Sequence, residues 1–286
     1  MKILVATDGS ECSQIAIEAL PAMCGNASHG IHVQTVVEPL PTLAGLELQE
    51  LESARKQVRT TVDKIKSQLP NCQIEGDVVV GQPSKVILDT AEQSGCDLIV
   101  MGTNGRKGLS RLFLGSVSRS VLLSARCGVR VVRAPIAGLA DRDYNVLIAT
   151  NDTFESDFAF DQILSSYWPE NTKFLLVTAL PDNGRSEQHQ LLATSWLKCC
   201  LVRLNVKLSP RSVSYELLNG EAKAAILAKA EAWPADLIVL GSRSQGMVGR
   251  LLRGSVSEAL TSSAPCSVEV LPMTKSRVEY VYVESH

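Results

Sequence analysis

A glycine-rich segment that occurs twice with the same spacing restricts most strongly how this chain can fold. The first copy combines an apolar run with spaced glycines: 97–101, Gly102, Gly105 and Gly115-Ser116. The second copy has the matching elements 139 residues later: 236–240, Gly241 and Gly254-Ser255. A glycine-rich loop between a strand and a helix can hold an anion on its backbone N–H groups. The repeat therefore predicts one α/β unit used twice.

Length and composition are those of an ordinary globular protein. The chain has 286 residues, of which 45% are hydrophobic and 20% charged, with a net charge of −2. This length suggests two domains of about 140 residues each. The weak charge gives no reason to expect a nucleic acid or a membrane as partner. No apolar run approaches the roughly 20 residues of a spanning helix. The N-terminal run turns polar at Thr7-Asp8, too early for a signal peptide, so we expect a cytoplasmic protein.

Cysteine and histidine are scattered along the chain. Its eight cysteines show no Cys-x-x-Cys spacing, and none of its four histidines stands at a metal-ligand spacing. We therefore expect reduced thiols that pack as small apolar residues, and no metal site built by the protein alone.

Short apolar runs alternate with helical patterns throughout the first half. We predict its strands at 2–7, 31–37, 74–80, 97–101 and 129–133. We predict its helices from Ser10 to Cys24, from Leu46 to Leu69, from Pro83 to Gln93 and over 116–125. Ser10 can cap the first helix, Gly25 can end it, and Pro83 suits the first position of its helix. This alternation is typical of a parallel sheet.

The second half repeats this order. We predict strands near 145–150, 172–178, 212–218, 236–240 and 267–271. The domains would then cover 1–135 and 143–273, followed by an extra segment at 274–286. Within that segment, 278–283 alternates like a sixth strand, although a frayed tail is the other interpretation. As a strand, it would join a sheet edge and could link two chains into a homodimer.

The alternation predicts a doubly wound parallel α/β sheet in each half, and such sheets bind ligands at the carboxyl ends of their strands. Ala6-Thr7-Asp8 and Gly102 would lie on that edge. Several better-known motifs are missing, namely the P-loop, the Gly-x-Gly-x-x-Gly fingerprint and the Gly-x-Ser-x-Gly elbow. The chain therefore does not match the common nucleotide-binding or hydrolase patterns.

The remaining pattern resembles the universal stress protein family in both halves. It consists of a strand ending in Thr7-Asp8-Gly9-Ser10 and the spaced motif Met-Gly-x-x-Gly-(nine residues)-Gly-Ser-Val-Ser. The resemblance implies two tandem five-stranded parallel sheets in the order 3-2-1-4-5, an adenine nucleotide alpha hydrolase-like fold. One branch of the family binds ATP, whereas another lacks the glycine motif and does not.

The resemblance also implies a role for individual residues. Ala6, Thr7 and Asp8 would line the nucleoside, with Asp8 accepting from the ribose hydroxyls. Val36, or Val37 one residue further on, would bond adenine through its backbone. Met101 and Gly102 would pass beside the ribose. The phosphates would be surrounded by Gly105, Arg106, Gly115, Ser116, Val117 and Ser118.

Elementary chemistry favours the same site. Glycine permits close approach of the backbone to a phosphate, and a helix start offers free N–H groups and a positive dipole end. Other interpretations stay open: Asp8 as a helix-capping carboxylate, Ser116 as a plain N-cap, and Arg106 as solvated surface. Gly105 and Gly115 can likewise be ordinary loop glycines with no role in phosphate binding.

The second copy departs from the pattern at three positions. Asn151 replaces Asp8, Asp152 replaces Gly9, and Ser244 replaces Gly105, whereas Gly241, Gly254 and Ser255 are kept. The ribose loses a carboxylate partner and the phosphates meet a negative charge. We therefore expect the second site to be empty or weak.

These observations predict a stress-response regulator that holds ATP, or ADP or AMP, in its first half. Mg²⁺ would arrive with the phosphates. Hydrolysis would be slow or absent, since no placed general base is evident. The alternatives are a protein-interaction module without nucleotide, bound to an unknown protein partner, and an ATP-splitting enzyme. We also expect the edge strands at 129–132 and 268–271 to pair within one chain, as a pseudo-dimer.

Overall fold

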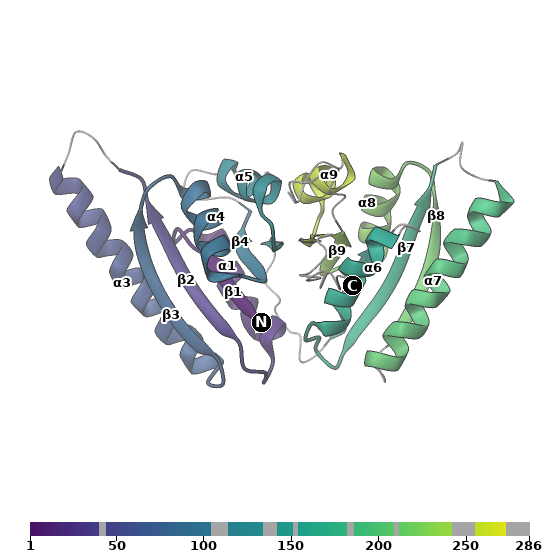
Figure 1. Cartoon of the computed structure of the whole chain (residues 1–286), viewed down its shortest axis with the longest axis horizontal. Helices are drawn as coiled ribbons and strands as arrows, with labels where there is room; N and C mark the ends of the chain where they lie inside the picture. The colour runs from purple at the N-terminus through teal and green to yellow at the C-terminus, as the bar shows by residue number, and fades with distance from the viewer. Residues whose placement is uncertain are drawn as a thin grey trace, which may run out of the picture.

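The computed structural model describes residues 1–39, 44–103, 114–133, 142–150, 154–181, 186–208, 212–241 and 255–272. Strands and helices alternate along both halves, as the sequence predicts (Figure 1). The strands of the first half are β1 Lys2–Ala6, β2 Gly30–Val37, β3 Gln73–Val80, β4 Leu98–Gly102 and β5 Gly128–Val132. Those of the second half are β6 Tyr144–Ala149, β7 Thr172–Leu180, β8 Ser212–Asn219, β9 Leu237–Gly241 and β10 Ser267–Leu271. All ten strands therefore lie where the sequence predicts them.

The helices also follow the predicted order. In the first half they are α1 Glu11–Glu18, α2 Leu20–Cys24, α3 Ala44–Gln68, α4 Pro83–Ser94 and α5 Ser116–Ser124. In the second half they are α6 Phe154–Ser165, α7 Glu187–Leu208, α8 Ala222–Ala232 and α9 Ser255–Ser263. The predicted helix from Ser10 to Cys24 is split at Ala19, because Pro21 has no N–H to continue the ladder.

The ten strands of the described residues join one sheet in the order β3-β2-β1-β4-β5-β10-β9-β6-β7-β8. Each half has the predicted 3-2-1-4-5 order with parallel neighbours. The two halves meet where β5 runs antiparallel to β10. The expected pseudo-dimer within one chain is therefore confirmed, and the two five-stranded sheets form a single continuous one.

Helices cover both faces of this sheet. On one face, α4, α5, α8 and α9 pack over a single hydrophobic cluster that runs through both halves. On the other face, α1, α2 and α3 cover one cluster while α6 and α7 cover a separate one. Among the described residues, the halves thus share a hydrophobic cluster on one face only.

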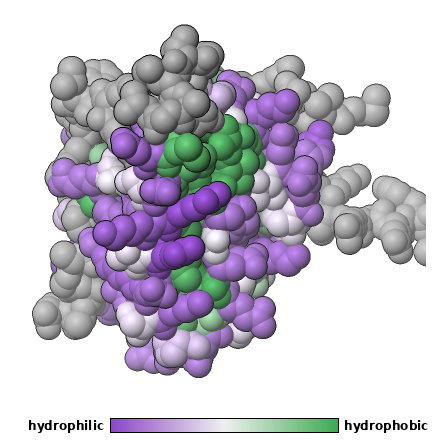
Figure 2. Space-filling model, turned by 90° about the vertical axis from the view of Figure 1, so that its left-hand side faces the viewer, coloured by the Kyte–Doolittle hydropathy of each residue, from purple (hydrophilic) through white to green (hydrophobic). Residues whose placement is uncertain are grey.

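The sheet ends at β3 and β8, far from the junction of the halves (Figure 1). Viewed from the β3 end, most of the surface is hydrophilic, with a narrow hydrophobic strip through it (Figure 2). Residues along β3 are largely exposed, whereas β4, β5 and β10 are buried along their whole length. This difference is typical of an edge strand and of strands enclosed by two helical layers. The predicted strand at 278–283 lies outside the described residues.

Candidate functional site

Three parallel strands of the first half end at one edge of the sheet, where the sequence predicts the site. Ala6, the last residue of β1, pairs with Gln34 of β2 and with Met101 of β4. Val36 lies two residues beyond Gln34 and packs against the same hydrophobic cluster as Ala6 and Met101. The structure therefore brings Ala6, Val36 and Met101 together.

The loop after β1 is held by its own hydrogen bonds. The backbone N–H of Thr7 donates to the carbonyl of Gln34 at 2.9 Å. The Thr7 hydroxyl donates to Ser13 Oγ at 3.0 Å and accepts from the N–H of Gly9 at 3.2 Å. Gly9 has φ +78°, which L residues rarely adopt, so the glycine is required by this turn. The loop is thus shaped before any ligand binds.

Asp8 takes part in the same turn. Its Oδ1 accepts from the N–H of Ser10 at 3.0 Å and from the Ser10 hydroxyl at 2.6 Å. Ser10 caps α1 by accepting from the N–H of Ser13, as the sequence predicts. Asp8 therefore orders the residue that caps the helix, but Ser10 and not Asp8 is the N-cap, which corrects the interpretation of Asp8 as the cap. A carboxylate has about four lone-pair sites, so Asp8 can accept a further hydrogen bond from a ribose hydroxyl.

Gly102 is a glycine because β4 passes close to the start of α1. A Cβ built there would lie 2.6 Å from the backbone carbon and oxygen of Cys12. The carbonyl of Gly102 accepts from the Ser118 hydroxyl at 2.9 Å, which ties α5 to the end of β4. Contacts inside the protein thus explain why residue 102 is a glycine and where the Ser118 hydroxyl donates its proton.

Gly115 closes the base of the glycine-rich loop. Its N–H donates to the carbonyl of Thr103 at 2.7 Å, so residues 103 and 115 are joined. Its φ of −65° is open to any residue, so backbone conformation does not demand glycine there. Gly115, rather than Ser116, is the N-cap of α5, which corrects the interpretation of Ser116 as a cap. Gly105 and Arg106 lie outside the described residues.

α5 starts at this edge, because its N-cap Gly115 is hydrogen-bonded to Thr103 directly after β4. Ser116, Val117 and Ser118 form its first turn, where backbone donors have no partner within the helix. Ser116 is exposed, and no acidic residue stands in this turn. Such a helix start favours an anion.

The second half presents a different edge. The backbone hydrogen bond from Thr7 to Gln34 has a counterpart here, since the N–H of Thr150 donates to the carbonyl of Val177 at 3.0 Å. However, the Trp196 indole donates to the Thr150 hydroxyl at 3.0 Å, which places a large ring at the end of β6. Glu258 stands in the first turn of α9, where a negative charge opposes an anion. Our sequence analysis missed both residues, although their alignment with Gln57 and Arg119 at the repeat offset contained the signal.

Gly241 ends β9 as predicted, and Ser255 begins α9. Gly254 lies outside the described residues, as do the three departures from the pattern, Asn151, Asp152 and Ser244.

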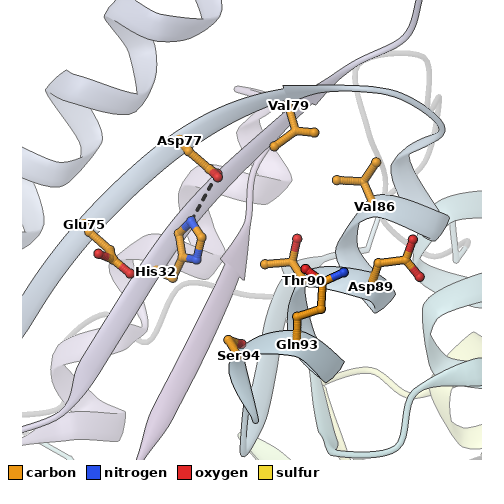
Figure 3. A pocket seen from close by; sticks show the side chains of 9 residues that line it. All are labelled: His32, Glu75, Asp77, Val79, Val86, Asp89, Thr90, Gln93 and Ser94. Atoms are coloured by element: carbon orange, nitrogen blue, oxygen red, sulfur yellow. Dashed lines mark ion pairs between the residues drawn. The ribbon is translucent and has the colours of Figure 1, made fainter.

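A separate cavity of about 610 Å³ lies beside β2, β3 and α4, where it opens on the face of the sheet (Figure 3). It is lined by His32, Glu75, Asp77, Val79, Val86, Asp89, Thr90, Gln93 and Ser94. His32 Nε2 lies 3.1 Å from Asp77 Oδ1, and the buried Gln34 amide donates to Asp77 and Thr90. Its carboxylates make it unsuited to phosphate. Sequence analysis does not predict this cavity, because its residues come from three separate elements.

Other metal-binding or reactive groups are few in the part of the chain that the structure describes. No group of three His, Cys, Asp or Glu side chains there could hold a metal ion. Burial raises the pKa of the Cys24 and Cys266 thiols to about 12, so both stay protonated at neutral pH. No described helix combines the length and apolar character that crossing a membrane requires.

The fold defines a class of protein: a doubly wound α/β domain, present twice, with a helix start at the carboxyl edge of its sheet. The sequence profile of the Universal stress protein family matches residues 1–133 and 145–272. Because these matches cover most of the chain, the chain belongs to the universal stress protein family.

Individual relatives agree with this assignment. A universal stress protein of Methanocaldococcus jannaschii, MJ0531, is 33% identical over 141 residues, which are 47% of this chain and 82% of the relative. One from Thermus aquaticus is 34% identical over 46% of this chain and 97% of its own length. A crystal structure of a universal stress protein from Archaeoglobus fulgidus covers 96% of this chain and 98% of its own, with 22% identity and a TM-score of 0.69. The first two relatives match about half of this chain, whereas the third shares its whole two-domain fold.

Proposed function

We propose that this chain is a stress-response regulator that binds an adenine nucleotide, ATP or its products ADP and AMP, in its first half. The observation that carries the proposal is the start of α5. Three backbone N–H groups without helical partners lie at the edge where β1, β2 and β4 end, and the first turn of α5 contains no acidic residue.

Each part of the edge suits one part of the nucleotide. The phosphates would lie against Ser116, Val117 and Ser118, and the family resemblance adds Gly105, Arg106 and Gly115 to the residues around them. Asp8 would accept from the ribose hydroxyls, and the backbone of Val36 would bond adenine. Mg²⁺ would come with the phosphates, since none of the described acidic residues forms a metal site.

Hydrolysis is slow or absent in this proposal. The Asp8 carboxylate accepts from the N–H and the hydroxyl of Ser10 and would also accept from the ribose hydroxyls, so it would not serve as a general base for water. The protein would then act by binding and releasing nucleotide rather than by turnover.

The experiment is calorimetric titration of the full chain with ATP and Mg²⁺, together with mass spectrometry of small molecules released from freshly purified, denatured protein. We expect one adenine nucleotide per chain. The alternative function, a protein-interaction module of the same fold, predicts no released nucleotide and no heat of binding. Rapid turnover of ATP would contradict the regulator and support an enzyme.

A further inference from the structure

The two halves meet at a pair of opposite charges that occupy the same position of the repeat. Arg130 of β5 lies directly opposite Glu269 of β10 in the antiparallel ladder. The two residues are 139 positions apart, which equals the repeat offset of Gly102 and Gly241. The pairs on either side are related by exchange of the two strands: Val131 faces Val268, and Val129 faces Val270. The local two-fold axis between the halves therefore passes through the Arg130–Glu269 pair.

A second pair repeats this arrangement on the helices. Arg119 of α5 forms an ion pair with Glu258 of α9, and these residues are also 139 positions apart. The two helices face each other across the junction (Figure 1). At both positions the first half carries arginine and the second half carries glutamate.

The strand pair is enclosed by protein. Arg130 is 6% exposed and Glu269 is 4% exposed. The valines on either side of each point into the core shared by both halves, so Arg130 and Glu269 point to the opposite face. Burial alone lowers the pKa of Arg130, but the adjacent carboxylate of Glu269 reverses this effect and the pKa is raised. Arg130 therefore stays charged inside the protein and depends on the carboxylate of Glu269 as its partner.

Symmetric pairing of like halves would destroy this arrangement. Two first halves joined through β5 would bring Arg130 against its own copy, with Arg119 near its copy as well. Two second halves would oppose Glu269 to Glu269 in the same way. Like charges directly opposite each other destabilise a strand pair, and more so when they are buried.

We propose that these two pairs form a charge code that makes the halves of one chain partners for each other. The code excludes pairing of first half with first half, and of second half with second half, between copies of this chain. Pairing of a first half with the second half of another chain satisfies the charges, but the covalent linker favours the partner in the same chain through its high effective concentration. The inference is independent of nucleotide binding.

The experiment uses two full-length variants with different affinity tags. One, R119E/R130E, carries glutamate at all four positions, and the other, E258R/E269R, carries arginine at all four. We expect each variant alone to lose amide protection in β5 and β10. Co-expressed, each first half meets a complementary second half in the other chain. The two variants should then copurify at a 1:1 ratio, several-fold above two tagged parent chains.

A variant with all four charges exchanged, R119E/R130E/E258R/E269R, is the matched control. Its charges are complementary within one chain, so it should unfold near the parent's midpoint and copurify no more than the parent does. Variants that accumulate only when co-expressed would support the code, since each chain then rescues the other. Copurification at the parent's level would overturn the proposal. So would a fourfold variant as unstable as the like-charged ones, because the sign of the charge would then not matter.

Discussion

The two halves of the chain share a scaffold and differ where a ligand would lie. In the first half, the N–H of Lys2 donates to Asp97 Oδ2 at 2.7 Å, and in the second half Asn145 donates to Asp236 Oδ2 at 2.9 Å. By contrast, the helix start that faces the carboxyl edge has no acidic residue in α5 and contains Glu258 in α9. Backbone geometry has therefore been kept in both copies while the chemistry of the edge has changed in one.

This difference separates the residues that the fold requires from those that ligand binding requires. Two identical copies would not show this distinction. The fold needs the strand order, the buried runs and the glycine of β4, and both halves supply them. The proposed nucleotide site needs a helix start without an acidic residue, which α5 has and α9 lacks. Trp196 against Thr150 shows that the second edge has gained packing of its own. In our proposal the repeat therefore serves two purposes, nucleotide binding in one half and assembly in both.

The largest effect should come from the junction of the halves. Glu269→Ala leaves Arg130 buried without its partner, which should cost about 3–5 kcal/mol of unfolding free energy. Glu258→Ala removes the exposed partner of Arg119 and should cost about 0–1 kcal/mol. Urea unfolding of both variants measures the contrast. Equal losses would show that the buried pair is not what joins the halves.

The next effect concerns the helix start of the first half. Gly115→Val should weaken ATP binding by about 100-fold or more, roughly 2.7 kcal/mol, because a branched side chain blocks close approach of phosphate. Its φ of −65° suits valine, so the fold should survive. The matched variant Gly254→Val should leave calorimetric binding unchanged. If Gly254→Val weakens binding instead, the nucleotide lies in the second half.

Much of the fold could be predicted from the sequence, because buried parallel strands appear as short apolar runs between clear helix signals. The order 3-2-1-4-5 followed from the resemblance, and the pairing of β5 with β10 followed from the need to cover two edges. The break at Ala19 is the exception, because Pro21 interrupts an otherwise helical pattern and falls in the first turn of α2.

The site was harder to predict, because its residues act through contacts that sequence spacing does not show. The glycine at Gly102 is explained by the backbone of Cys12, and the hydroxyl of Ser118 by the carbonyl of Gly102. Neither contact is local in the chain. The charge pair of Arg130 and Glu269 was visible only as opposite charges at one repeat position.

A smaller effect should follow from making each edge resemble the other. Asp8→Asn gives the first half the residue of the second and should weaken ATP binding about tenfold, near 1.4 kcal/mol, by removing a charged acceptor. The reverse variant, N151D/D152G/S244G, should create a second site weaker than the first, because Glu258 and Trp196 remain. Calorimetry resolves both. A second site as strong as the first would mean that the three loop residues alone made the difference.

The smallest effect is on pH dependence, and it also distinguishes the halves. His29 precedes β2, and Thr172 holds the corresponding place in β7. Burial, with the nearby N-terminal charge, lowers the pKa of His29 below its usual 6.5. Below that pH the unfolded chain takes up a proton that the folded chain resists, so stability should fall as the pH drops. His29→Thr should flatten the change in Tm between about pH 7.5 and 5.5, whereas the exposed His189→Thr should not. An unchanged slope in His29→Thr would place the acid sensitivity elsewhere.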